Sequence, residues 1–227
     1  MGNVFANLDW SILTTAMMRV VPALICLTIH ELSHGFVAYR LGDNTAKQMG
    51  RLTLNPLRHI DLVGLVMMAL FRFGWAKPVP VNMRNFKNPK RGMALTALAG
   101  PVSNFILASI LLVIYGLLSS FMPHDAGRGW QIATDVLVST VWLSVALGIF
   151  NLIPIPPLDG SKVLFSFLSD SMYEKLMRVE RFGMIILMAV IWSGLLSNTL
   201  GDATSWVFSK LFNIADGVYK LVSPMVA

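Results

Sequence analysis

Charged residues are scarce in this chain of 227 residues. Asp, Glu, Lys and Arg together make up 13% of the sequence, well below the roughly 25% of a typical soluble domain. Apolar residues make up 55%, and the mean hydropathy is +0.65. This composition argues against a soluble domain and predicts an integral membrane protein, with the lipid bilayer as its surroundings.

Cysteine is nearly absent. The single Cys26 excludes an intrachain disulfide framework and a zinc site built from cysteines. The net charge is +6, but no dense run of Lys and Arg is interleaved with aromatic residues, so nucleic acid is not a predicted partner. In a membrane protein, an excess of Lys and Arg is instead typical of cytoplasmic loops.

The chain also lacks internal repeats, low-complexity tracts and a convincing signal peptide. Its first residues carry no positive charge before the first apolar run, and Arg19 interrupts that run, so we expect the run to be retained as a span. We interpret residues 1–227 as a single membrane domain. It has a core over about 10–165 and accessory spans over about 182–224.

Long apolar runs predict the spans. They cover about residues 10–39, 93–121 and 132–153, followed by a fourth run over 182–200. A weaker fifth run over about 206–222 either crosses the membrane or lies along its surface. We therefore expect an all-α, polytopic helical bundle. Clusters of Lys and Arg at 40–58, 84–91 and 162–181 assign those loops to the cytoplasm, so the first span runs from outside to inside.

Two segments between the first and second spans are not typical spans. Residues 62–71 are apolar but too short to cross a bilayer as a straight helix, which predicts a re-entrant or interfacial hairpin segment. Residues 76–82 alternate valines with two prolines, a pattern that favours an edge strand or an extended loop.

The sequence His30-Glu31-Leu32-Ser33-His34 lies inside the first apolar run. Residues four apart share one face of a helix, so His30 and His34 can bind one Zn²⁺ between them. Glu31 is rotated by about 100° from His30, within reach of a water at the metal. Because ionisable residues inside a span are costly and rare, we interpret the motif as a metal site near the cytoplasmic side.

A catalytic zinc usually has three protein ligands, so the motif lacks one. Asp159 follows a proline-rich break at the end of the third run and is a natural candidate, although Asp-Gly is equally a turn signal. Asn104, near the start of the second run, is polar within the membrane. It either joins two helices through hydrogen bonds or belongs to the site.

Three motifs together resemble the site-2 protease family of intramembrane zinc metalloproteases. They are H-E-x-x-H in the first core span, G-P-x-x-N at 100–104 and N-x-x-P-x-P-x-L-D-G at 151–160. Residues 74–82 resemble the small bacterial and archaeal branch. Unlike some members, the sequence shows neither a PDZ nor a CBS domain.

The resemblance implies one zinc held by His30, His34 and Asp159, with Glu31 as the general base. It implies that Asn151 contacts the substrate backbone, and it places Asn104 in the second core helix. The expected substrate is the transmembrane segment of another protein, cleaved from the cytoplasmic side of the cell membrane. The alternatives are a catalytically silent metal-binding scaffold and a transporter, which would show polar residues spread over several spans and a repeat between halves.

Overall fold

The computed structural model describes residues 10–61, 63–64, 76–123 and 127–226. Within these ranges the regular elements are helices, apart from one isolated antiparallel bridge between Ile60 and Ala76. The long helices are α1 (Trp10–Arg40), α4 (Pro89–Ser120), α5 (Arg128–Leu152) and α9 (Ser197–Val226). The shorter ones are α2 (Thr45–Gln48), α6 (Asp159–Phe165), α7 (Asp170–Val179) and α8 (Gly183–Trp192), with 3₁₀ turns η2 (Pro56–Arg58), η3 (Met83–Asn85) and η4 (Glu180–Phe182).

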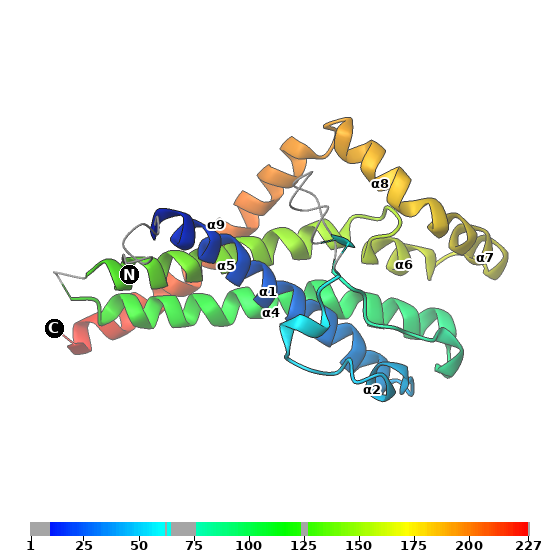
Figure 1. The fold of residues 1–227 in the computed structure, drawn as a ribbon, viewed down its shortest axis with the longest axis horizontal. Coiled ribbons are helices and arrows are strands. Elements are labelled where there is room, and N and C mark those ends of the chain that lie inside the picture. Colours follow the sequence, from blue (N-terminus) through cyan, green and yellow to red (C-terminus); the bar gives the residue numbers. More distant parts are fainter. Residues whose placement is uncertain (1–9, 62, 65–75, 124–126, 227) are drawn as a thin grey trace, which may run out of the picture.

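Three of the described helices are long and apolar enough to cross a membrane: Met18–Arg40 within α1, Pro89–Ser120 (α4) and Arg128–Leu152 (α5). The helices α1, α4 and α5 begin and end within four residues of the runs expected from the sequence. Figure 1 shows these helices and α9 as an elongated bundle. The protein is therefore an all-helical, multi-pass membrane protein, as predicted.

The bundle is held together by small and branched side chains where α4, α5 and α9 meet. Ala108 and Leu112 of α4 pack against Val141 and Val145 of α5, and Ala215 of α9 completes this buried cluster. Small residues let helix backbones approach closely in a membrane, where packing rather than hydrophobic burial drives association. The packed helices α4 and α5 also contact α1, so these three helices form the frame of the site.

The prediction of a continuous fourth span over 182–200 is wrong. The helix α8 ends at Trp192, and α9 begins at Ser197 after a turn in which Gly194 has φ +71°. Glycine adopts this left-handed conformation without steric penalty, and so it commonly ends helices. The helical segments before and after the turn are bent by 88°, and as one broken span they would bring the number of spans to four. The apex of this bend stands away from the other helices in Figure 1.

The segment over 76–82 is extended, as its prolines predicted. Lys77 N–H donates to His59 O at 2.9 Å, and the Arg51 guanidinium donates to Lys77 O at 2.8 Å. Asn82 N–H donates to the buried Asp43 carboxylate at 2.6 Å. These bonds fasten the segment beside the end of α1. The interfacial segment predicted over 62–71 falls largely outside the described residues.

The end of α5 carries the break that the prolines predicted. The helix stops at Leu152, residues 153–157 form turns, and Leu158 precedes the short helix α6. Proline cannot continue a regular helix because it lacks the N–H donor and clashes with the preceding turn. The break directs the chain back toward α4, so that Asp159 becomes the first residue of α6.

Candidate metal centre

Two turns of α1 and the first residue of α6 bring three potential ligands together. His30 Nε2 and His34 Nε2 lie 3.1 Å and 3.2 Å from the same oxygen, Asp159 Oδ2. All three residues are buried, and their ligand atoms lie within 4.8 Å of one another. Two imidazole nitrogens and one carboxylate oxygen form a donor set suited to zinc. The structure therefore brings Asp159 to the histidine pair.

A hydrogen bond to the second ring nitrogen of His34 determines the orientation of its imidazole ring. His34 Nδ1 lies 2.7 Å from the backbone oxygen of Thr96 on α4. A carbonyl oxygen can only accept, so Nδ1 carries a hydrogen. In the neutral imidazole the lone pair is then on Nε2, the nitrogen that faces the space between the donors. This is the orientation in which a histidine serves as a metal ligand through Nε2.

The second ring nitrogen of His30 contacts the fully buried Asn104. As the amide stands, Asn104 Nδ2 lies 3.3 Å from His30 Nδ1, and Asn104 Oδ1 is buried with no hydrogen-bond partner in the described part of the chain. A half-turn of the amide exchanges its nitrogen and oxygen, so Oδ1 could accept a hydrogen from Nδ1. His30 needs that tautomer to bind a metal through Nε2, so the residues fit a zinc ion.

The carboxylate of Asp159 stays ionised. Burial alone would raise its pKa, but hydrogen bonds and charge interactions with His30 and His34 outweigh this effect and hold the pKa well below its ordinary value. A metal ligand has to be deprotonated to bind.

The helix α4 approaches the two histidines so closely that only glycine fits at the contact. A Cβ added at Gly100 would lie 2.5 Å from His34 Cε1 and 2.6 Å from His30 Nε2. Small residues such as Gly100 and Ser103 are typical of close helix contacts in a membrane, but they do not indicate which side chains are contacted. The partnership between Thr96 and His34 has no signal in the sequence, because Thr96 acts through its main-chain oxygen.

Glu31 lies next to these donors and shares a cavity with them. The cavity has a volume of about 390 Å³ and is lined by all three candidate ligands together with Glu31, Val79 and Asn151, among others. Glu31 Oε2 accepts a hydrogen bond from the N–H of Val79 at 2.7 Å. A carboxylate, a buried donor cluster and an extended backbone segment therefore border one space.

Asn151 lies in the last turn of α5, where its Nδ2 donates to Leu147 O at 3.0 Å. Asn104 and Asn151 therefore have different spatial relations to the donor cluster. Asn104 contacts His30 directly, whereas Asn151 lines the cavity.

Comparison with known proteins decides the family. The sequence model of Peptidase family M50 matches residues 19–133 and 121–194, most of the chain. The chain belongs to Peptidase family M50. This is the site-2 protease family that the three motifs indicated.

Relatives of this M50 peptidase cover most of its length. It is 38% identical over 204 residues to the "Putative zinc metalloprotease YwhC" of Bacillus subtilis, which covers 85% of this chain and 91% of the relative. It is 30% identical over 193 residues to the "Putative zinc metalloprotease Rip2" of Mycolicibacterium smegmatis, covering 82% of this chain and 70% of the relative.

A third relative is archaeal. The M50 peptidase is 28% identical over 175 residues to the "Zinc metalloprotease MJ0392" of Methanocaldococcus jannaschii, covering 76% of this chain and 41% of the relative. No solved structure gives a significant match. The family and the three helices that can cross a membrane make the protein a membrane peptidase, and its buried donor set of two histidines and an aspartate suits Zn²⁺.

Proposed function

We propose that this M50 metalloprotease hydrolyses a peptide bond in or near a transmembrane segment of another membrane protein. We assign His30, His34 and Asp159 as the zinc ligands and Glu31 as the general base. The observation that carries the proposal is the position of the buried donor cluster, within an apolar helix that is long enough to cross the membrane. A site at that depth meets polypeptide that is itself in the membrane.

The residues divide the work of hydrolysis. Zinc at such a site supplies Lewis-acid chemistry, polarising a carbonyl and activating water. Glu31 takes the proton of the attacking water and returns it to the leaving amine. Thr96 O and Asn104 hold the imidazoles of His34 and His30 in the orientation that the ligands need.

The substrate has to be extended at the cleaved bond, because a helix occupies its carbonyl oxygens in internal hydrogen bonds. The extended residues 76–82 border the cavity through Ala76, Pro78, Val79 and Val81. We propose that an unwound substrate strand lies against this segment and that Asn151 contacts its backbone from the opposite helix. This arrangement would present one carbonyl to the donor cluster and one bond to Glu31.

The site faces the cytoplasm in this proposal. His30 and His34 lie in the half of α1 that ends at Arg40, and Lys47, Arg51 and Arg58 follow within twenty residues. The excess of Lys and Arg in cytoplasmic loops gives this orientation. Products released on this side would enter the cytoplasm.

Metal content and cleavage, measured together on the detergent-purified protein, test the proposal. We expect about one zinc per chain in the wild type and in Glu31→Gln. We expect a strong loss of zinc in Asp159→Ala and no loss in Asp202→Ala, a matched change of an exposed aspartate. Cleavage of a membrane-protein substrate should require both Asp159 and Glu31.

Three outcomes would contradict parts of this assignment. Full zinc affinity in Asp159→Ala would place the third ligand elsewhere. Retained cleavage in Glu31→Gln would remove Glu31 as the base. Zinc bound by a wild type that cleaves no membrane protein, in lipid as in detergent, would favour the silent scaffold.

A further inference from the structure

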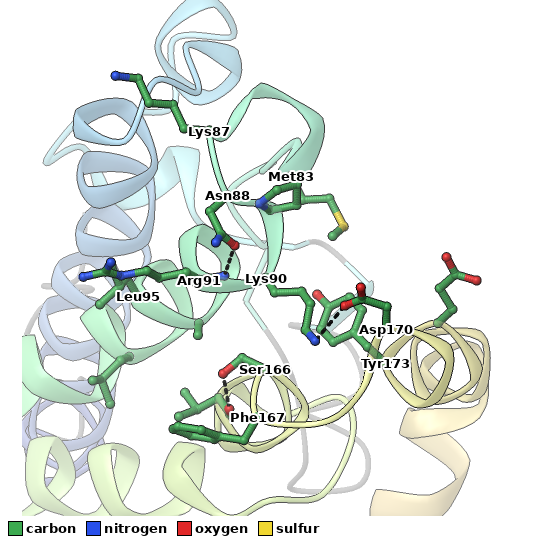
Figure 2. A pocket seen from close by; sticks show the side chains of 15 residues that line it. Met83, Lys87, Asn88, Lys90, Arg91, Leu95, Ser166, Phe167, Asp170 and Tyr173 are labelled. Atoms are coloured by element: carbon green, nitrogen blue, oxygen red, sulfur yellow. Dashed lines mark hydrogen bonds and ion pairs between the residues drawn. The ribbon is translucent and has the colours of Figure 1, made fainter.

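A second and larger cavity, of about 990 Å³, lies between the beginning of α4 and the helices α6 and α7. It shares no lining residue with the cavity at the metal centre. In Figure 2, Arg91 and Leu95 lie on one side, Lys90, Asp170 and Tyr173 on the other, and Ser166 and Phe167 close the base. The family assignment and the proposed hydrolysis leave this cavity without a role.

The rim of the cavity is basic. Three basic side chains (Lys87, Lys90 and Arg91) and two acidic ones (Asp170 and Glu174) line it. Lys90 pairs with Asp170 at 2.9 Å, whereas neither Lys87 nor Arg91 has an ion pair among the described residues. The N-terminal end of the 32-residue α4 adds the partial positive charge of the helix dipole, although Asn88 already accepts from the N–H of Arg91. The rim therefore attracts an anion.

The hydroxyl of Tyr173 is a further observation that points to a ligand. Tyr173 is only 5% exposed and lines the cavity. Its hydroxyl oxygen has no hydrogen-bond partner among the described residues, while Lys90 Nζ lies 5.6 Å from the centre of its ring. Leaving a buried hydroxyl without a partner is costly, and native proteins rarely do so. A ligand with acceptor oxygens would satisfy it beside the positive charge of Lys90.

The cavity is apolar on its membrane side. Leu95 and Leu98 follow Arg91 by one and two turns along α4, a helix that can cross the membrane. Leu95 is 42% exposed, and Phe167, in the turn after α6, is 82% exposed. A basic rim that continues into an apolar wall along a spanning helix matches an anionic headgroup joined to an acyl chain.

We propose that this cavity binds an anionic phospholipid of the cytoplasmic leaflet. The phosphate lies near Arg91, Lys90 and the Tyr173 hydroxyl, and an acyl chain lies along Leu95, Leu98 and Phe167. Charge selects this ligand, because the Lys90–Asp170 pair is neutral as a whole, and Lys87 and Arg91 outnumber the one remaining acidic residue, Glu174. Clusters of Lys and Arg at the cytoplasmic end of spanning helices are the usual sites for acidic headgroups.

The test is lipid binding by the full chain in an uncharged detergent, followed by native mass spectrometry and by the unfolding temperature. Phosphatidylglycerol and phosphatidylcholine are added in parallel. We expect phosphatidylglycerol to be retained at least fivefold more tightly and to raise the unfolding temperature. Arg91→Gln and Tyr173→Phe should each weaken its apparent affinity about 5- to 10-fold. The control Lys175→Gln removes a positive charge from α7 outside the cavity and should change it less than twofold.

Equal retention of the two lipids, or wild-type affinity in both variants, would overturn the proposal. Stabilisation by inorganic phosphate as strong as that by phosphatidylglycerol would indicate a free-anion site instead. Stabilisation by a soluble acidic peptide but not by phosphatidylglycerol would indicate a protein partner. If Arg91→Gln fails to fold, the conservative Tyr173→Phe variant and the comparison of the two lipids on the wild type still test the proposal. None of these measurements depends on proteolysis, so they stand apart from the proposed cleavage.

Discussion

The N–H of Val79 donates a hydrogen bond to the side chain of Glu31 at 2.7 Å, across 48 residues of sequence. This bond joins the extended segment after the first span to the carboxylate beside the donor cluster. One oxygen of Glu31 is oriented by it, and the segment is held at the wall of the cavity. The proposed base and the proposed substrate-binding strand are therefore one structural unit.

Replacing Val79 by proline should remove the hydrogen bond between the backbone at residue 79 and the Glu31 side chain. Val79→Pro removes the N–H, and the flanking Pro78 and Pro80 keep the segment in the extended conformation that proline adopts. We expect cleavage to fall at least tenfold because Glu31 loses its orienting donor, with zinc content unchanged. The control is Val79→Ala, which keeps the N–H and should retain most activity. Equal activity in the two variants would show that the bond has no catalytic role.

Much of the site could be predicted because it depends on local spacing. His30, Glu31 and His34 lie within five residues on one helix, so their relative positions follow from helical geometry. The prolines after α5 predicted the break that brings Asp159 back toward the bundle. The long apolar runs likewise predicted α1, α4 and α5, because a spanning helix needs about 20 apolar residues.

The rest depends on how helices pack, which one sequence does not contain. The contact of His34 with Thr96 O arises only because α4 crosses α1 at Gly100. Hydropathy also gave a wrong prediction for the residues between α8 and α9, where it indicated one continuous span. The residues there are apolar enough for one span, but Gly194 takes a left-handed conformation and the helix bends. Average hydropathy over a window does not detect a single-residue turn.

The contact at Gly100 predicts a metal-binding defect from adding one methyl group. In Gly100→Ala the new Cβ would lie within 2.6 Å of both imidazoles, so the rings or α4 have to move. Displaced ligands bind zinc less well, and we expect affinity to fall 10- to 100-fold in a chelator competition assay. The control is Gly217→Ala, since a Cβ at Gly217 meets nothing within 4 Å. Wild-type zinc affinity in Gly100→Ala would mean that the histidines are not held against α4.

The contact between Asn104 and His30 predicts a positioning role for the amide. In Asn104→Leu, the Nδ1 hydrogen of a zinc-bound His30 would be buried without an acceptor. We expect zinc affinity to fall roughly 10- to 100-fold. Asn104→Asp keeps an oxygen acceptor of the same size and should lose less affinity than the leucine variant. The same chelator competition measures both, and the opposite ranking would show that Asn104 acts only through packing.

The buried Asp43 predicts a pH-dependent stability. Its carboxylate accepts hydrogen bonds from Asn82 N–H at 2.6 Å, from the Asn85 amide at 2.7 Å, and from the N–H and hydroxyl of Thr45. Burial opposes the charge, but these donors outweigh it and lower the pKa of Asp43 below its ordinary value of 3.8. The ionised form therefore stabilises the folded state above pH 3.8, and this contribution is lost as the pH falls through the lower, folded-state pKa.

The variant Asp43→Asn should reproduce this loss at neutral pH. The amide oxygen cannot replace a carboxylate that accepts from Asn82, Asn85 and Thr45 together. We therefore expect the free energy of unfolding at pH 7 to fall by about 1–3 kcal/mol. The difference from the wild type should shrink below pH 3.8, because Asp43 of the unfolded wild type then takes up a proton. It should vanish once the pH is below the folded-state pKa, where the carboxyl is neutral in both states. Unfolding in mixed detergent micelles at several pH values measures it, with the exposed Asp202→Asn as the control. A difference that stays constant between pH 7 and pH 3 would show that the variant disturbs packing rather than a charge.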